Sequence, residues 1–140
     1  MIGAPKGLPL PSANRWTAPF WDACAQHRLV VQRCAACGTF RHPPGPLCAN
    51  CRSSDFAWEE SAGRGEVFTY TVAHHAVHPA VKEQVPYGVV VVRLDDCGGA
   101  LLTSNVIDVP PSALYVGLRV KLAWDDIAEG VALPRFMIDA

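Results

Sequence analysis

Four cysteines in two Cys-x-x-Cys pairs are the residues whose types and spacing most clearly predict chemistry. The pairs are Cys34-Ala-Ala-Cys37 and Cys48-Ala-Asn-Cys51, and ten residues separate them. Each pair fits on one tight turn, and two such turns facing each other place four sulfurs at the corners of a tetrahedron. That is the coordination of a closed structural zinc site. The sequence therefore predicts one zinc ion held by these four thiolates.

Other chemistry of the same thiols stays open at this point. Iron is bound by the same four ligands in some proteins. Two disulfides would need an oxidising compartment, whereas the chain begins Met-Ile-Gly-Ala-Pro-Lys without an apolar leader, so we expect a cytoplasmic location. A redox dithiol would need a β-α-β pattern around one pair, and none is visible. Four thiolates leave no open coordination position, so we expect the metal to stabilise a subdomain rather than to catalyse.

The remaining titratable residues do not form a recognisable catalytic set. His74, His75 and His78 lie together after a predicted strand, and no acidic residue follows until Glu83. We therefore interpret them as loop or interface residues.

Two acidic pairs and two further cysteines have simple interpretations. The pairs Asp95-Asp96 and Asp125-Asp126 are expected to solvate turns or strand ends. Cys24 and Cys97, which have no cysteine neighbour, are read as ordinary thiols.

Composition narrows the functional classes. The chain has 140 residues, half of them apolar, and a formal net charge of −1. Nucleic-acid binding normally leaves a basic footprint, which is missing here. No apolar run approaches the length of a membrane span, so no membrane segment is expected.

Three segments are expected to position these residues, with bounds 1–30, 31–62 and 63–140. The first is a proline-rich arm and a helix from Ala18 to about His27, with Thr17 as its cap and Pro19 in its first turn. Because Trp16, Phe20 and Trp21 make this helix too apolar to stand alone, it must dock either on its own chain or on a partner.

The second segment carries the cysteines. Residues 29–33 are predicted to form a strand leading into the first pair, and residues 39–42 to form its return. Residues 56–61 are expected to connect outward, and Gly63-Arg64-Gly65 marks the boundary.

The third segment has the alternation and β-branched content of short strands. A hairpin turn is expected at 95–99, and one helical turn at 109–114. The fold is therefore predicted as mainly β: a helix and a four-cysteine zinc ribbon, followed by a five-stranded OB-type barrel. Its strands are expected at 66–72, 87–94, 101–107, 120–124 and 135–138.

Taken in order, these features resemble the DUF35 family, in which a rubredoxin-like zinc ribbon is joined to an OB-fold. The resemblance covers nearly the whole chain and includes the aromatic helix and the two cysteine pairs with Gly38. Arg52, and not glycine, follows the second pair, which is a departure from the rubredoxin pattern. The matching segments beyond the ribbon are 65–71, 86–89, 101–106, Gly117-x-x-Val120 and 134–136.

The resemblance implies an accessory subunit without turnover of its own. Such chains are partners of thiolase-like enzymes in acyl-CoA metabolism: thiolases, or lipid-transfer-protein-type aldolases that cleave acyl-CoA side chains, including those of steroids. We expect two copies on a two-fold thiolase-like dimer, with acyl-CoA near the shared interface. The expected partner contacts are the helix aromatics Trp16, Phe20 and Trp21, and the loop histidines His74, His75 and His78.

Two further expectations concern charged and aromatic side chains. Arg33, Arg41 and Arg64 are candidates for contacts with CoA phosphates, although they also suit the solvation of a small cysteine-rich subdomain. The alternative function is single-stranded nucleic-acid binding, for which Phe68 and Tyr70 would supply stacking surfaces.

Overall fold

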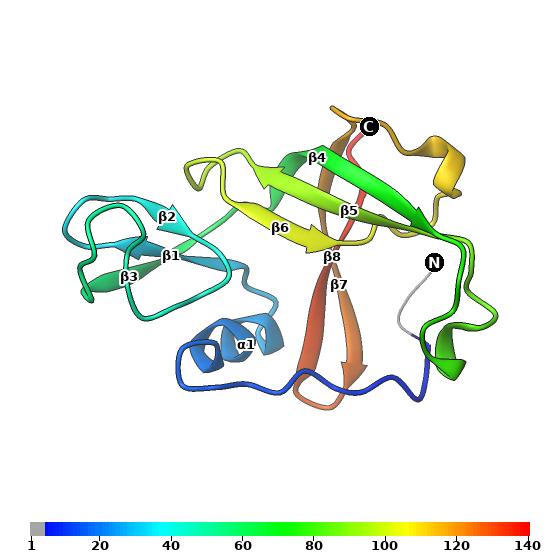
Figure 1. Ribbon diagram of the computed structural model, residues 1–140, viewed down its shortest axis with the longest axis horizontal. Helices are drawn as coiled ribbons and strands as arrows, with labels where there is room; N and C mark the ends of the chain where they lie inside the picture. The colour runs from blue at the N-terminus through cyan, green and yellow to red at the C-terminus, as the bar shows by residue number, and fades with distance from the viewer. Residues whose placement is uncertain (1–4) are drawn as a thin grey trace.

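Figure 1 shows the computed structural model, which describes residues 5–140. It contains one α-helix, two single-turn 3₁₀ helices and two antiparallel sheets. A three-stranded sheet has the order β2-β1-β3, and a five-stranded sheet has the order β6-β5-β4-β7-β8. The predicted fold class is confirmed: the chain is mostly β, with a cysteine cluster in the first sheet and a nearly closed barrel made by the second.

The helix α1 (Ala18–Ala25) is shorter than predicted and begins differently. The Thr17 side chain makes no capping hydrogen bond to the helix. Instead Asn14 Oδ1 accepts hydrogen bonds from the amides of Trp16 and Thr17, both at 2.9 Å. The helix stops before His27 because that residue has a φ of 57°, in the left-handed region that ends a helix.

The ribbon sheet contains β1 (Val30–Cys34), β2 (Phe40–Arg41) and β3 (Phe56–Glu60). Residues 56–61, which were expected to connect outward, lead to the barrel and also form a strand of the ribbon. Every residue of β3 pairs with β1, from Val30↔Glu60 to Cys34↔Phe56. In β3 only Trp58 is partly buried. The segment therefore lacks the alternation of apolar and polar residues from which a strand is predicted.

The barrel sheet contains five strands and two single-turn helices. The hairpin β7–β8 is longer than predicted and bends at a bulge between Asp126 and Ala128. Its length was not predicted because acidic residues and Pro134 interrupt its apolar pattern. Proline is tolerated in β8 because that strand lies at the end of the sheet. The elements are β4 (Arg64–Ala73), η1 (Pro79–Val81), β5 (Tyr87–Leu94), β6 (Leu101–Ser104), η2 (Pro111–Ala113), β7 (Arg119–Ala128) and β8 (Val131–Ile138).

The barrel closes between β6 and β8 through the residues that follow β6. Val106 forms a parallel bridge with Phe136. Phe136 donates its amide to the Asn105 carbonyl at 3.0 Å, and its own carbonyl accepts from Ile107 at 2.8 Å. The predicted strand 101–107 therefore ends its regular pairing at Ser104, and its last part closes the barrel.

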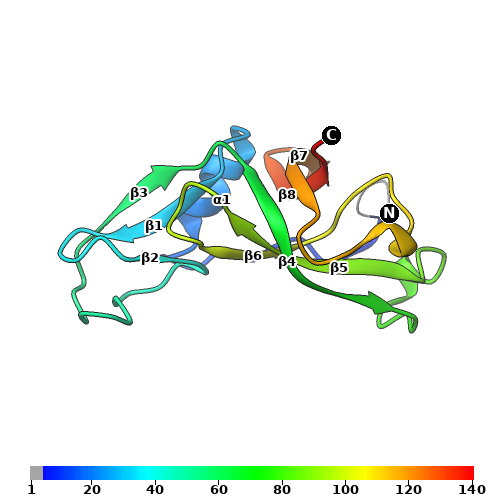
Figure 2. The same cartoon turned by 90° about the horizontal axis from the view of Figure 1, so that it is seen from above.

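The helix, ribbon and barrel share one hydrophobic core. Val90, Val92 and Phe136 are fully buried inside the barrel, and the same cluster includes Phe20 of α1 and Val31 of β1. Figure 2 shows α1 lying between the ribbon sheet and the β7–β8 hairpin. None of the helices within residues 5–140 has the length and apolar character needed to cross a membrane.

Candidate functional site

The four predicted metal ligands come together at one end of the ribbon. Their Sγ atoms all lie within 4.8 Å of one another, with Cys34 and Cys51 at 3.5 Å and Cys37 and Cys48 at 3.6 Å. A zinc ion with Zn–S bonds of about 2.3 Å needs sulfurs about 3.8 Å apart, whereas a disulfide needs about 2.05 Å. The residues fit a single structural zinc ion with no open ligand position.

Two residues with positive φ form the turns that bring the sulfurs together. Gly38 has a φ of 78° and donates its amide to the Cys34 carbonyl at 2.9 Å. Arg52 occupies the matching place in the second turn, with a φ of 66° and a 2.8 Å bond from its amide to the Cys48 carbonyl. The departure from the family pattern at Arg52 therefore changes the residue but keeps the turn.

Polar neighbours favour the thiolate form of Cys37. Hydrogen bonds from the Thr39 hydroxyl, the Thr39 amide and the Asn50 side chain lower the pKa of Cys37 to about 5. The thiolate is the form that binds metal. By contrast, burial raises the pKa of Cys24 to about 12 and that of Cys97 to about 11, which agrees with their interpretation as ordinary, unreactive thiols.

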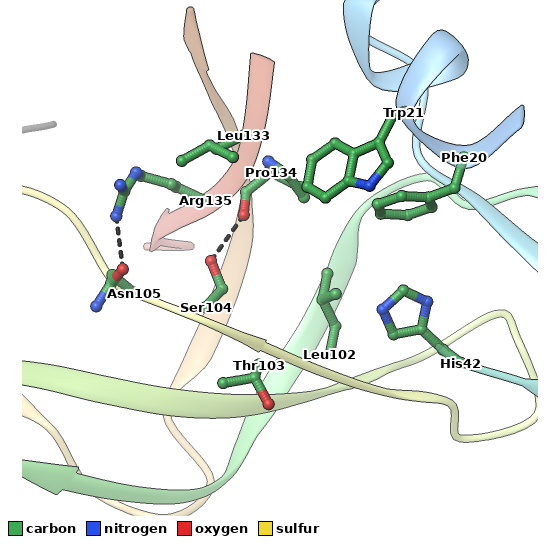
Figure 3. Close-up of a pocket in the computed structure, with 10 residues that line it drawn as sticks. All are labelled: Phe20, Trp21, His42, Leu102, Thr103, Ser104, Asn105, Leu133, Pro134 and Arg135. Carbon is green, nitrogen blue, oxygen red and sulfur yellow. Dashed lines mark hydrogen bonds between the residues drawn. The ribbon is translucent and has the colours of Figure 1, made fainter. Parts of the chain in front are cut away.

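A second feature is a pocket of about 250 Å³ between α1, β6 and β8 (Figure 3). Trp21, Phe20 and His42 form an aromatic wall, in which the rings of Phe20 and Trp21 meet edge to face at 5.1 Å. Burial lowers the pKa of His42, which favours the neutral form of its ring. The remaining lining comes from the barrel: Leu102, Thr103, Ser104, Asn105, Leu133, Pro134 and Arg135.

The polar groups on the barrel side of this pocket bond to one another. Ser104 Oγ donates to the Pro134 carbonyl at 2.7 Å. The buried Arg135 guanidinium donates to the side chains of Asn105 and Asp125. The pocket therefore combines an aromatic wall with a polar base, and the one cation of that base, Arg135, is paired with Asp125. This arrangement suits an apolar group better than an anion.

The predicted interface aromatics have different environments. Phe20 is only 4% exposed and belongs to the core of its own chain. Trp16 is half-buried beneath the Arg15 guanidinium, and Trp21 is half-buried at the pocket. Of the two interpretations of the helix, own-chain packing describes Phe20, and Trp21 remains available at the surface.

The predicted loop histidines lie far from this helix. His74 and His75 are exposed, and His78 accepts a 3.0 Å hydrogen bond from the Ala80 amide through Nδ1. Figure 1 shows their loop, between β4 and β5, at the opposite end of the molecule from α1 and the ribbon.

The three candidate CoA-binding arginines are not brought together. Pairing of Gln32 with Arg41 and of Arg33 with Phe40 places Arg33 and Arg41 on opposite faces of the ribbon sheet. Arg64 belongs to the barrel and pairs with Asp139.

Both acidic pairs have side-chain partners in addition to the expected solvation of turns or strand ends. Asp95 pairs with Arg119, and Asp125 pairs with Arg135. Asp126 Oδ1 lies 2.7 Å from His27 Nε2. Asp96 accepts hydrogen bonds from Ser61 and Ala62 in the segment that joins the two sheets, both at 2.7 Å.

Sequence reasoning missed the barrel half of the pocket. The run Leu102 to Asn105 and the segment Leu133 to Arg135 are about 30 residues apart in the chain and meet only when the barrel closes. The one available signal was that the apolar segment beginning at Leu101 ends in Ser104-Asn105. This pattern indicates polar groups at a sheet edge, but it does not indicate which residues they contact.

Comparisons with known proteins agree with this architecture. Residues 21–57 match the family model described as the rubredoxin-like zinc ribbon domain of ChsH2, and residues 58–125 match its C-terminal OB-fold domain. A solved chain of the Ltp2-ChsH2(DUF35) aldolase is 42% identical with a TM-score of 0.83, and the match covers 93% of this chain and 99% of that one.

Curated relatives carry several names. A probable enoyl-CoA hydratase alpha subunit of Thermomonospora curvata is 44% identical over 94% of this chain. The 3-oxo-4,17-pregnadiene-20-carboxyl-CoA hydratase alpha subunit of Mycobacterium tuberculosis is 33% identical over 89% of it. This chain spans only 40% and 39% of those two proteins.

A shorter relative corresponds to this chain over most of its own length. The DUF35 domain-containing scaffold protein of Methanocaldococcus jannaschii is 33% identical, over 72% of this chain and 70% of the relative. With its zinc ribbon and OB-fold barrel in this order, the chain belongs to the DUF35 family.

Proposed function

We propose that this chain is a non-catalytic accessory subunit that docks on a thiolase-like large subunit of an aldolase acting on acyl-CoA substrates, including steroid side chains. The observation that carries the proposal is the likeness to the DUF35 chain of the Ltp2-ChsH2(DUF35) aldolase over nearly the full length of both chains. Two copies would sit on a two-fold dimer of the large subunit. A cluster of four thiols placed to bind a metal ion supports a cytoplasmic location, where thiols are kept reduced.

The chemistry of the described residues supports a binding role. The metal site has four protein ligands, which leaves no position for a substrate. Burial raises the pKa of the remaining thiols, Cys24 and Cys97, and so disfavours the nucleophilic thiolate. The large subunit is therefore proposed to supply the catalytic groups.

The aromatic pocket supports a docking role for the α1 side of the molecule. Trp21 combines partial exposure with an aromatic neighbour and an adjacent hollow, which are properties of residues that dominate interface energies. We propose that an apolar side chain of the large subunit inserts beside Trp21, and that Trp16 and the loop of His74, His75 and His78 make further contacts.

We further propose that CoA phosphates contact one or more of the arginines Arg33, Arg41 and Arg64. Arg33 and Arg64 are exposed and form ion pairs with Glu59 and Asp139, which a phosphate would have to displace. Arg41 donates to Gln32 and Gly45 within the ribbon. Because so many of the described arginines already pair with carboxylates, the alternative of single-stranded nucleic-acid binding receives no support from charge.

Substitution of Trp21 tests the docking proposal. The large subunit is identified by co-purification with this chain from the native host, and the affinity between the two is measured by calorimetry. We expect Trp21→Ala to weaken the complex by about 30-fold, the effect of losing an interface anchor of about 2 kcal/mol. Met137→Ala, at a half-exposed position on β8, is the matched control and should bind normally.

Two results would contradict the proposal. One is acyl-CoA cleavage by the isolated chain, abolished by a single substitution in it. The other is failure of the wild-type chain to form a complex. If Trp21→Ala instead lowers the melting temperature of the free chain and binds normally, Trp21 is a core residue and the interface lies elsewhere.

A further inference from the structure

The second half of β4 has a partner on one side only. β4 pairs with β5 from Gly65 to Ala73, but with β7 only from Arg64 to Glu66. Val67 makes the last bonds on the β7 side: its amide donates to Leu118, and its carbonyl accepts from Gly117. Among residues 5–140, no strand pairs with the Phe68–Ala73 edge beyond that point.

The directions of the backbone groups identify which residues face this edge. The Leu94 amide donates to the Ala100 carbonyl, so it points toward β6 and away from β4. Backbone groups alternate in direction along a strand. Val91 and Val89 lie an odd number of residues from Leu94, so their N–H and C=O groups face β4. Their register partners, Thr69 and Thr71, therefore bond within the sheet. A bulge at Phe68 shifts the alternation, and Tyr70 and Val72 direct their N–H and C=O groups to the open edge.

The side chains around this edge are uncharged, and its aromatic ones are exposed. Residues 67–73 read Val-Phe-Thr-Tyr-Thr-Val-Ala and carry no charge. Phe68 is 42% and Tyr70 40% exposed, and the adjoining turn before β7 exposes Tyr115 by 58% and Val116 by 65%. The nearest charges on β4 and β5, Glu66 and Arg93, pair with each other at 2.7 Å.

We propose that the Phe68–Ala73 edge of β4 receives an extended strand of the large subunit, which adds to the barrel sheet by backbone pairing. An open strand edge selects an extended segment, because only that conformation supplies donors and acceptors at the matching spacing. Apart from Arg93, whose guanidinium lies 4.9 Å from the centre of the Phe68 ring, the rim is uncharged, which favours apolar or β-branched side chains on the added strand. A long apolar edge is an aggregation hazard unless something covers it.

This inference rests on the proposed function, since the large subunit supplies the strand. Val72→Pro removes an outward N–H, and proline is tolerated where a strand amide faces away from its sheet. Val72→Thr is the matched control, because it keeps the amide and a β-branched side chain. Affinity for the large subunit that co-purifies with the wild-type chain is measured for both variants, together with their melting temperatures.

We expect Val72→Pro to weaken binding by at least about tenfold, as the loss of backbone pairing requires, and Val72→Thr to bind as the wild type does. Hydrogen exchange on the wild-type complex is a second measurement that needs no variant. The amides of Tyr70 and Val72 should exchange fast in the free chain and slowly in the complex, while those of Thr69 and Thr71 are protected in both.

The outcomes separate the two proposals. If the wild-type chain forms no complex, the proposed function fails, and the strand addition fails with it. If the wild type binds but the Tyr70 and Val72 amides stay unprotected, or Val72→Pro binds as tightly as Val72→Thr, the docking stands and the strand addition is wrong. A free chain that is dimeric, and becomes monomeric in Val72→Pro, would assign the edge to a second copy instead.

Discussion

Individual residues at the metal site show how the sequence accommodates a departure from its family pattern. The first turn uses Gly38 and the second uses Arg52, yet both adopt a left-handed backbone and make the same bond to a cysteine carbonyl. A residue with a Cβ is strained in that region by about 1–2 kcal/mol. The folding of the ribbon around the metal must supply that energy.

Replacing Arg52 therefore has a predictable sign. Arg52→Gly should raise the free energy of unfolding of the zinc-loaded chain by about 1 kcal/mol, since relief of strain exceeds the extra entropy of glycine in the unfolded state. The measurement is chemical denaturation at constant zinc. Gly38→Ala is the control and should destabilise by a similar amount. If Arg52→Gly is less stable than the wild type, the arginine side chain stabilises the fold by more than its left-handed backbone conformation destabilises it.

At the scale of elements, the turn between β5 and β6 joins the barrel to the ribbon. A Cβ on Gly98 would lie 2.7 Å from the ring of Phe40, so the turn packs directly on the ribbon. Asp96 of the same turn bonds to Ser61 and Ala62 between β3 and β4. Burial alone would raise the pKa of Asp96, but the bonds from the Ala62 amide and the Ser61 hydroxyl outweigh it and lower the pKa.

Asp96→Ala should lower the free energy of unfolding by about 1–2 kcal/mol at pH 7, through loss of two hydrogen bonds. Because folding lowers this pKa below 3.8, the contribution is complete above about pH 4 and is lost as pH falls through the folded value. The difference between wild type and variant should therefore shrink in acid. Asp55→Ala, at an exposed ribbon position, is the control. If the difference in free energy of unfolding between the wild type and Asp96→Ala grows as the pH falls, this account is wrong.

For the whole molecule, one core connects parts that the chain order separates. Leu29, Val30 and Val31 lead into the metal site and are at most 4% exposed. They pack in the same cluster as Val90 and Val92 of the barrel. We therefore expect the metal to affect the stability of the barrel through β1, and not that of the ribbon alone.

Zinc removal should consequently destabilise the entire chain. Calorimetry of the zinc-loaded protein should show one transition, and chelation should lower its midpoint by more than about 10 °C, given the large folding energy of structural zinc sites. The reactivity of the cysteines provides a second measurement, independent of calorimetry. After chelation Cys34, Cys37, Cys48 and Cys51 should react rapidly with a thiol reagent, and the fully buried Cys24 and Cys97 more slowly. A barrel that melts at the same temperature without metal would contradict the shared core.

The sequence alone predicted the parts that depend on short-range spacing. Cys-x-x-Cys pairs determine which four sulfurs meet, because each pair sits on one turn. Alternation and β-branched runs located the barrel strands, and Tyr87–Leu94 was predicted with the bounds observed. The turn at 95–99 followed from its Asp and Gly residues.

Only the tertiary structure decided which distant segments meet. The pairing of β3 with β1, the burial of Phe20 and the pocket formed by Ser104 with Pro134 all depend on contacts across the folded chain. So does the open edge at Tyr70 and Val72, because a strand's sequence does not say where its neighbour stops. Local patterns determine which face of an element is apolar, whereas barrel closure determines what covers that face and what remains for a partner.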